Sequence, residues 1–337
     1  MSRKAEAGAP GAAVWWPDGW GQRFTIFVDV EEEFDWSAPF SREARAVTAL
    51  PALLAFAERF AERGIGVTYM CDHPVATDPA AVEVLRQISA LPGAEIGTQL
   101  HPWVNPPFEE PLSARTSYAG NLPEALEAAK LDILTEAITA AIGKPPRAYR
   151  AGRYGIGPNT VRLLAERGYR LDTSMRAGFD YRADGGPDFR PIGTAATWLD
   201  HGLIELPLTT VFTGAAGRIG AALYQAASHV PGARGLLART GLVSRVPLTP
   251  EGVPVAEAIE AIRVAAGEGL RVLNLSFHSP SLVPGHTPYV RDAADLARFH
   301  AWWDAVLAEL DRLGVGPASL ADVLAACDRA RASATAA

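Results

Sequence analysis

The strongest constraint on the fold of this chain is a regular alternation of short apolar, β-rich runs with longer helical patterns. The apolar runs, which predict strands, cover residues 24–29, 65–70, 94–100, 147–151, 169–173, 203–206 and 271–277. The helical patterns cover residues 43–63, 79–91, 123–142, 158–167, 255–267, 292–313 and 319–332. Strands that alternate with helices indicate parallel βαβ units. About seven such units fit an α/β barrel or a doubly wound sheet.

Composition narrows the class of protein further. With 337 residues and 48% hydrophobic residues, the chain can bury a large core, and we expect one domain over residues 23–330. Residues 1–22 are expected to form a partly flexible extension, and residues 331–337 a tail. A net charge of −7 argues against a nucleic-acid partner. No stretch is apolar enough to predict a membrane span or a secretory signal, and two cysteines favour a reducing cytoplasm.

In parallel α/β folds, functional residues gather where strands end. The first predicted strand ends in Asp29 and Glu31, which are two residues apart and therefore project to the same side of an extended chain. Two such carboxylates can share a metal, or one can act as a base while the other is a ligand. The alternative is a solvated acidic loop or a helix N-terminus, where Asp and Glu are common.

The third predicted strand carries Gln99 and His101 on one face. A neutral imidazole at a strand end can be a metal ligand, although a lone histidine is more often a structural residue. Asp72 and His73 follow the second strand and are weaker candidates for the same site.

Two arginines, Arg150 and Arg153, follow the fourth predicted strand. A buried arginine needs an acidic partner, so pairing with Asp29 or Glu31 is expected, unless both arginines lie on the surface.

The strand over 271–277 leads into His278, which could donate a proton to a leaving group. Acids, histidines and arginines at four strand ends together predict a hydrolytic site that uses a metal.

Five blocks in chain order, VDVEEEF, EIGTQLHP, YRAGRYG, LIELPL and LNLSFHSPSL, resemble the motifs of the polysaccharide deacetylases of the NodB-homology group, carbohydrate esterase family 4. The resemblance covers about residues 24–325. The phrases FHSPSLVPGHTPYVR, CDHPVATDP and GNLP look most like the WalW-like subgroup, which is linked to cell-surface polysaccharide genes.

The resemblance implies a distorted (β/α)7 barrel that removes N- or O-linked acetyl groups from sugars with the help of one divalent metal, zinc being the expected ion. By the same resemblance, Asp29 matches the general base and His278 the general acid. Arg150 matches the arginine that orients the base, with Arg153 as the alternative.

The resemblance also implies that Glu31 and His101 hold the metal. The family motif has a second histidine where this chain has Gln99, so Gln99 is the third candidate ligand. Glutamine is a weak zinc ligand. This departure keeps two other functions open: a metal-independent hydrolase of C–N bonds in amides or ureides, and a catalytically degenerate barrel that binds a glycan.

Aromatic and polar residues near these loops are candidates for binding a sugar. Trp36 and Trp103 could stack on a sugar ring, and Ser117 and Asn121 could hydrogen-bond its hydroxyl groups, although packing is an equal alternative for each. The expected partner is an acetylated sugar or polysaccharide. In the cytoplasm it would be a nucleotide-linked or lipid-linked sugar precursor.

Overall fold

The computed structural model describes residues 11–227, 230 and 232–336, so residues 1–10 of the predicted extension and residue 337 of the predicted tail lie outside the described residues. Its centre is a run of parallel strands in the order β8-β6-β5-β4-β3-β2-β11. These strands are β2 (Arg23–Val30), β3 (Val67–Cys71), β4 (Glu95–Leu100), β5 (Ala148–Ala151), β6 (Leu171–Asp172), β8 (Ile204–Glu205) and β11 (Val272–His278). The predicted α/β class with parallel strands is confirmed.

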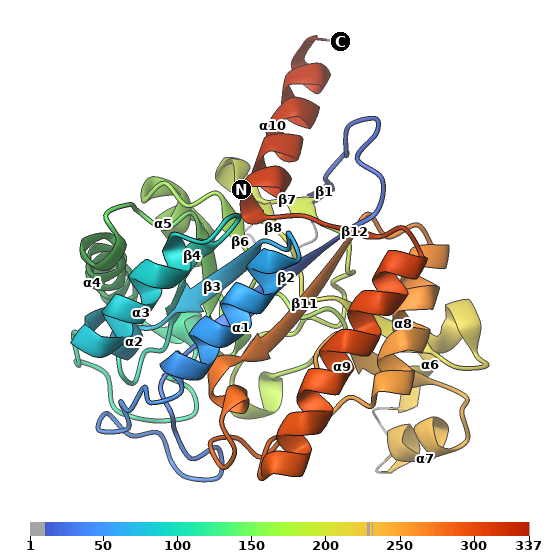
Figure 1. Ribbon diagram of the computed structural model, residues 1–337, viewed down its shortest axis with the longest axis horizontal. Helices are drawn as coiled ribbons and strands as arrows, with labels where there is room; N and C mark the ends of the chain where they lie inside the picture. The colour runs from blue at the N-terminus through green and yellow to red at the C-terminus, as the bar shows by residue number, and fades with distance from the viewer. Residues whose placement is uncertain (1–10, 228–229, 231, 337) are drawn as a thin grey trace, which may run out of the picture.

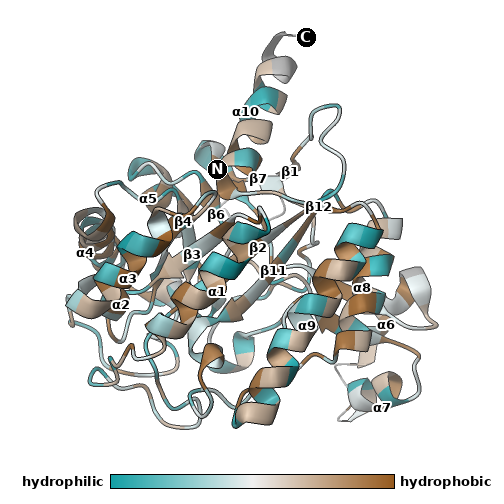
Figure 2. Ribbon diagram, viewed as in Figure 1, coloured by the Kyte–Doolittle hydropathy of each residue, from teal (hydrophilic) through white to brown (hydrophobic). Residues whose placement is uncertain are grey.

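Helices cover the outside of these strands (Figure 1). They are α1 (Leu50–Glu62), α2 (His73–Thr77), α3 (Pro79–Ser89), α4 (Glu124–Ile142), α5 (Thr160–Glu166), α8 (Val255–Gly267) and α9 (Ala293–Arg312). In α1, Leu53, Phe56 and Phe60 recur at helical spacing and are buried against the strands. Figure 2 shows that α1, α3 and α9 each carry both hydrophilic and hydrophobic residues, as expected for helices that lie between a core and solvent.

The helix predicted over 43–63 is shorter in the structure, because α1 begins only at Leu50. The residues ahead of it form a loop, and Phe40, Ser41 and Ala44 line a cavity there. The strands predicted over 169–173 and 203–206 shrink to the two-residue strands β6 and β8. In the first case, the helix propensity of residues 43–49 is overridden, because these residues belong to the loop that contributes to the cavity.

The two ends of the parallel run approach each other without a strand ladder between β8 and β11 in the described part of the chain. Instead, the backbone N–H of Thr209 donates to the carbonyl oxygen of Asn274 at 3.2 Å, and the N–H of Asn274 donates to Oγ1 of Thr209 at 2.8 Å. The amide Nδ2 of Asn274 also donates to the carbonyl oxygen of Leu206 at 3.2 Å. The segment that follows β8 is therefore hydrogen-bonded to β11.

Apolar residues fill the amino end of the strands. The helix α10 (Leu320–Ala336) buries Leu324 and Cys327 in a cluster with Phe27 and Met70 of the strands. The predicted N-terminal extension contributes β1 (Ala12–Ala13), which pairs antiparallel with β7 (Thr197–Trp198). Short β12 (Gly316–Pro317) pairs with β2. The interior at this end of the strands is therefore apolar and packed.

A small lobe that the strand and helix patterns do not predict follows β8 and precedes α8 in the chain, and its two helices lie beside α8 (Figure 1). It consists of β9 (Thr210–Thr213), α6 (Gly220–Ala226), α7 (Ala233–Arg239) and β10 (Ser244–Pro247), with β9 and β10 paired antiparallel. Among the described residues, no helix combines the length and the apolar character needed to cross a membrane.

Candidate active site

A cavity of about 530 Å³ opens at the carboxyl ends of the parallel strands. Its charged and polar walls include Asp29, Glu31, Gln99, His101, Arg150 and His278. Asp29 and Glu31 lie two residues apart along β2 and its end, and both face this cavity. The strand ends singled out in the sequence therefore meet at one place, and their side chains share one solvent-accessible space.

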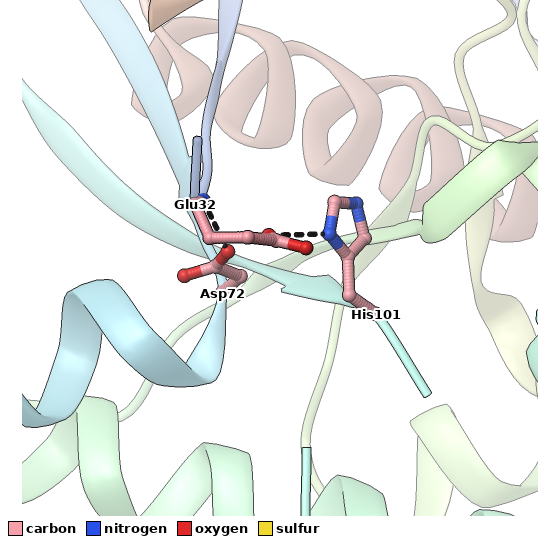
Figure 3. Close-up of side chains that lie close together, drawn as sticks. All are labelled: Glu32, Asp72 and His101. Atoms are coloured by element: carbon pink, nitrogen blue, oxygen red, sulfur yellow. Dashed lines mark hydrogen bonds and ion pairs between the residues drawn. The ribbon is translucent and has the colours of Figure 1, made fainter. Parts of the chain in front are cut away.

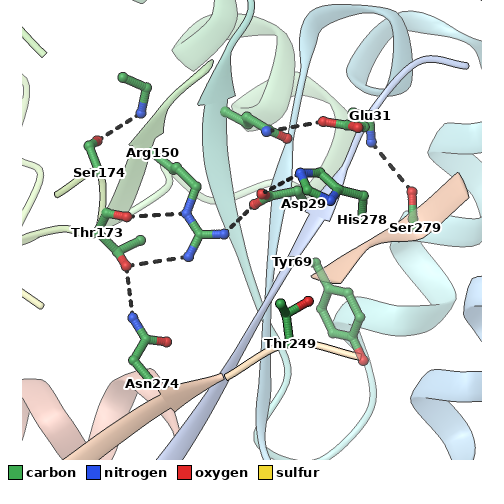
Figure 4. A network of polar contacts seen from close by, with 12 residues as sticks. Asp29, Glu31, Tyr69, Arg150, Thr173, Ser174, Thr249, Asn274, His278 and Ser279 are labelled. Carbon is green, nitrogen blue, oxygen red and sulfur yellow. Dashed lines mark hydrogen bonds and ion pairs between the residues drawn. The ribbon is translucent and has the colours of Figure 1, made fainter. Parts of the chain in front are cut away.

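Asp29 is fixed by an arginine that is itself fully buried. Nη1 of Arg150 donates to Oδ1 of Asp29 (Figure 4). Nε of Arg150 donates to the carbonyl oxygen of Thr173 at 3.2 Å, and Nη2 donates to Oγ1 of the same residue at 3.3 Å. Nδ2 of Asn274 in turn donates to Oγ1 of Thr173 at 2.9 Å. These contacts leave the guanidinium one orientation, in which it pairs with the carboxylate of Asp29.

His278 lies opposite Asp29 in the register of β11 and β2. Its Nε2 is 3.5 Å from Oδ2 of Asp29, and its Nδ1 donates to Oε2 of Glu251 at 2.7 Å. Burial alone would lower the pKa of His278, but the carboxylates of Glu251, Glu31 and Asp29 raise it to about 10. His278 is therefore cationic at neutral pH and can donate the proton on Nε2 into the cavity.

Glu31, Gln99 and His101 form a second group in the same cavity. Nε2 of Gln99 donates to Oε2 of Glu31 at 3.2 Å, and Nε2 of His101 lies 3.5 Å from that oxygen. All three side chains are buried. Burial raises the pKa of Glu31 to about 7, an effect that His278 and His101 oppose. Oε1 of Glu31 and Oε1 of Gln99 accept no hydrogen bond from any described residue.

Behind His101 lies a buried Glu/Asp/His group, Glu32, Asp72 and His101, whose ligand atoms all lie within 4.8 Å of one another (Figure 3). Nδ1 of His101 lies at hydrogen-bond distance from Oε2 of Glu32, 2.8 Å, and Nε1 of Trp103 donates to Oε1 of Glu32 at 2.7 Å. The backbone N–H of Glu32 donates to Oδ2 of Asp72 at 2.7 Å. Burial raises the pKa of Glu32 to about 8 and that of Asp72 well above its usual range.

The hydrogen bonds of this buried group determine how His101 faces the cavity. In the tautomer that carries its proton on Nδ1, His101 donates to Glu32 and leaves Nε2 to accept or to ligate. A carboxylate bonded to the far nitrogen is the usual support of a metal-binding histidine. Glu32 therefore orients His101.

The residues on the cavity side fit a divalent cation. They offer one imidazole nitrogen, from His101, and two buried oxygens without donors, Oε1 of Glu31 and Oε1 of Gln99. Buried acceptors without partners are costly, and a cation would satisfy both. Such a donor set, with one nitrogen and two oxygens, suits several divalent metals and is richer in oxygen than most zinc sites.

Of the four predicted sugar-binding residues, two line the cavity and two do not. Trp36 lines the cavity, with its ring centroid 5.1 Å from that of His278. Trp103 also lines it, but its ring stacks on His101 at 4.3 Å. Ser117 and Asn121 do not line the cavity. Oγ of Ser117 accepts from Nη1 of Arg153 at 2.8 Å, and Nδ2 of Asn121 donates to the carbonyl oxygen of Gly185 at 2.8 Å.

Arg153, the alternative to Arg150, also reaches the cavity wall but not Asp29. Its Nη2 lies 3.1 Å from Oδ2 of Asp184, and its guanidinium lies over the ring of Tyr118. Both Arg153 and Tyr154 have positive φ, at 54° and 63°, which is unusual for residues with a side chain. This turn follows Gly152 and carries the two side chains to the cavity.

Two residues that matter to the site gave no usable signal in the sequence. Glu251, which holds His278, comes from the loop after β10, and its spacing from His278 follows no motif considered above. Glu32 stands in a run of three glutamates, and its burial cannot be distinguished from that of its neighbours by pattern. His73, a candidate from its position, lies on α2 and does not line the cavity.

Comparison with known proteins supports the fold. No protein-family model and no curated protein matches this sequence. Among solved structures, a candidate polysaccharide deacetylase from Mycobacterium smegmatis is 21% identical, with 96% of this chain and 95% of that chain covered and a TM-score of 0.53. A 4-α-glucanotransferase from Thermococcus litoralis is 11% identical, with 90% of this chain and 40% of that chain covered and a TM-score of 0.51.

The chain therefore has the fold of a polysaccharide-deacetylase-type α/β protein, and the predicted NodB-type fold is confirmed. The WalW-like subgroup stays a prediction. Since the glucanotransferase has a similar fold and a different activity, the reaction has to be argued from the residues in the cavity.

Proposed function

We propose that this protein is a hydrolase that removes an N- or O-linked acetyl group from a sugar, with one divalent metal bound by Glu31, His101 and Gln99. The observation that carries the proposal is the contact series Arg150–Asp29–His278, which faces the unpartnered oxygens beside Nε2 of His101 in one cavity. A base, an acid and a cation site within one cavity are the parts that hydrolysis of an amide or ester needs.

The two titratable groups have complementary roles. The carboxylate of Asp29 is held in place by Arg150, with Oδ2 toward His278, and would accept a proton from the attacking water. His278 is cationic, so it can donate its Nε2 proton to the sugar nitrogen or oxygen as the bond to the acetyl carbon breaks. When bound, a divalent cation supplies polarisation of a carbonyl group and acidification of water. Each of the two proton transfers is worth roughly 10²- to 10⁴-fold in rate.

The walls of the cavity suit a sugar. Trp36 and Tyr289, whose ring centroids lie 5.7 Å apart, line the cavity beside His278. Aromatic faces bind the apolar faces of sugar rings, and the surrounding carboxylates and amides accept and donate hydrogen bonds. The substrate is then an acetylated sugar of a cell-surface polysaccharide or its precursor. Both cysteines are free and buried, which fits a cytoplasmic site of action and a nucleotide-linked or lipid-linked precursor.

The proposal is tested by acetate release from acetylated amino sugars, with protein purified without chelators and without a metal-binding tag. Asp29→Asn should lower turnover at least about 10²-fold while leaving the melting temperature near that of wild type, because Asn keeps the shape of Asp. Asp304→Asn, at an exposed surface position, is the control. Normal turnover in Asp29→Asn contradicts the assignment of the base.

Metal content separates the metal-assisted reaction from a metal-independent one. The metal-independent alternative is favoured by one contact, since Nε2 of Gln99 donates to Oε2 of Glu31 and so pairs two of the three candidate metal ligands with each other. About one divalent ion per chain, lost in His101→Ala and in Glu31→Ala, supports the proposal. Absence of metal uptake, together with hydrolysis of a small amide in the presence of a chelator, would replace it with the metal-independent C–N hydrolase.

A further inference from the structure

One cation in the cavity has no role in the proposed chemistry. Arg176 lines the cavity, yet no carboxylate of the described residues lies within ion-pair distance of its guanidinium. Among the described residues, its one hydrogen bond to another side chain runs from Nη1 to the hydroxyl oxygen of Tyr181, at 3.3 Å, and its buried Nε has no partner there. Arg150 and Arg153, the other arginines of the cavity, both have carboxylate partners.

Aromatic rings hold this guanidinium in place. Cζ of Arg176 lies 4.0 Å from the ring centroid of Phe179 and 5.1 Å from that of Tyr154. Rings on which a guanidinium stacks fix its plane and keep its charge without neutralising it. Burial opposes the charge, but the phenol groups of Tyr154, Tyr181 and Tyr289 raise the pKa of Arg176, so it remains cationic.

A second arginine strengthens the positive potential at this end of the cavity. Cζ of Arg245 lies 3.4 Å from the centroid of the same Phe179 ring, and its Nη1 donates to the carbonyl oxygen of Gly178 at 2.9 Å. Residues 206–250, which include the lobe, contain no Asp or Glu. Two guanidinium groups beside one ring repel each other, and nothing acidic in this segment offsets them.

The position of Arg176 indicates which part of a substrate it would meet. Trp36 packs against His278, and Tyr289 packs against Trp36, so these rings form a cavity wall beside the acid. Tyr289 is also close enough to act on the charge of Arg176. Tyr181, bonded to Arg176, lines the same cavity. Since His278 donates to the atom that the sugar keeps, this wall faces the sugar and not the acetyl group.

We propose that the substrate sugar carries an anionic group, a carboxylate or a phosphate, and that Arg176 binds it. The inference rests on the proposed function for its orientation, because the sugar side of the cavity is defined by His278. The guanidinium presents a planar array of N–H donors that suits both carboxylate and phosphate oxygens. The cavity then holds both the groups for chemistry and a guanidinium for substrate selection.

The test is equilibrium binding by calorimetry with three probes: neutral N-acetylglucosamine, N-acetylmuramic acid, which adds a carboxylate, and N-acetylglucosamine 6-phosphate. Wild-type protein should bind at least one anionic probe at least about tenfold more tightly than the neutral one, and the preference should shrink as salt is added. The anionic probe that binds with the higher affinity shows whether Arg176 selects a carboxylate or a phosphate.

Substitutions connect the preference to Arg176. Arg176→Gln should reduce the ratio of anionic to neutral affinity to near one, and Arg176→Lys should retain part of it. Arg182→Gln, which removes an exposed arginine paired with Asp180, should leave the ratio unchanged. Melting temperatures of all three variants establish that they are folded.

The outcomes separate this inference from the proposed function. Equal affinity for the three probes, or a preference for anions that survives in Arg176→Gln, overturns the inference. Acetate release from the neutral sugar alone would overturn it while leaving the deacetylase proposal intact. Arg176-dependent anion binding without acetate release from any probe would support the anion site and count against deacetylation.

Discussion

Nδ1 of His278 lies 2.7 Å from Oε2 of Glu251, and the backbone N–H of His278 donates to the other oxygen of the same carboxylate at 3.1 Å. Ser281 also donates to that oxygen, at 2.5 Å. Glu251 therefore fixes both the orientation and the charge of the imidazole, while Nε2 is left to face Asp29 and the cavity. The acid of the proposed reaction depends on a residue from a different loop.

Glu251→Gln should shift the alkaline limb of the pH–activity profile downward. A general acid works only while protonated, so activity falls as pH rises through the pKa of His278, which is raised to about 10 in the wild type. The amide keeps an acceptor for Nδ1 but removes the negative charge, so that pKa falls, by about one unit or more. Profiles of kcat/KM measure the shift, with exposed Glu257→Gln as control. An unchanged alkaline limb would rule out His278 as the acid.

Gly152→Ala should weaken metal binding by crowding His101. A Cβ added at Gly152 would lie 2.4 Å from Cδ2 of His101 and 2.6 Å from the carbonyl oxygen of Leu100, so the imidazole must move. A displaced ligand typically costs about 10- to 100-fold in metal affinity. Titration with zinc, manganese or cobalt measures the change. Gly193→Ala, where no atom lies within 4 Å of the new Cβ, should bind metal like the wild type. Equal affinity in both variants would contradict the ligand role of His101.

Much of the fold could be predicted from the alternation of apolar runs and helical patterns. The long strands β2, β4 and β11 and the long helices α4 and α9 lie close to the predicted ranges, because each combines a strong pattern with a buried face. The lobe from β9 to β10 could not be predicted in the same way. Its helices are short, and within the described part of the chain its strands pair only with each other.

The residues of the candidate site that follow parallel strands could be predicted from the sequence, and the residue from a loop could not. Strand ends in a parallel fold converge, so Asp29, Arg150 and His278 could be placed together before their contacts were known. A buried arginine needs an acidic partner, and the sequence could not decide between Asp29 and Glu31. The structure pairs Arg150 with Asp29. Glu251 could not be found, because a loop residue that turns inward leaves no periodic pattern in the sequence.

Lys130→Met should destabilise the protein strongly. The ammonium group of Lys130 is fully buried, lies 3.1 Å from Oε1 of Glu110, and donates to the carbonyl oxygens of Pro102, Asn105 and Pro107. It thus holds the loop that follows His101 against α4. Removal leaves a buried carboxylate and three carbonyls without their donor, at a cost of about 3–5 kcal/mol.

Chemical denaturation of Lys130→Met measures this free energy of unfolding. Lys144→Met is the matched control, because Lys144 is 48% exposed and lies 3.7 Å from Glu95, an ion pair worth at most about 1 kcal/mol. A loss of stability at position 130 no larger than that at position 144 would show that the loop does not depend on the buried ammonium.

Glu127 on α4 makes stability depend on pH. Burial raises the pKa of Glu127 to about 7 in the folded protein, against 4.5 as the ordinary value, and its Oε1 accepts from Oγ1 of Thr160 at 2.5 Å. A carboxyl group whose pKa is raised binds more protons in the folded state than in the unfolded state between these two values. Its contribution to stability is therefore full below pH 4.5 and declines as pH rises to about 7.

Glu127→Gln removes this proton linkage while keeping an oxygen acceptor for Thr160. Near pH 4.5 the variant and the wild type should have similar free energies of unfolding, and by pH 8 the variant should be the more stable by up to about 3 kcal/mol. Urea denaturation across this pH range gives the difference directly. Glu136→Gln, at an exposed position of the same helix, should track the wild type at every pH. A difference between Glu127→Gln and the wild type that does not change with pH would mean that Glu127 stays ionised in the folded protein.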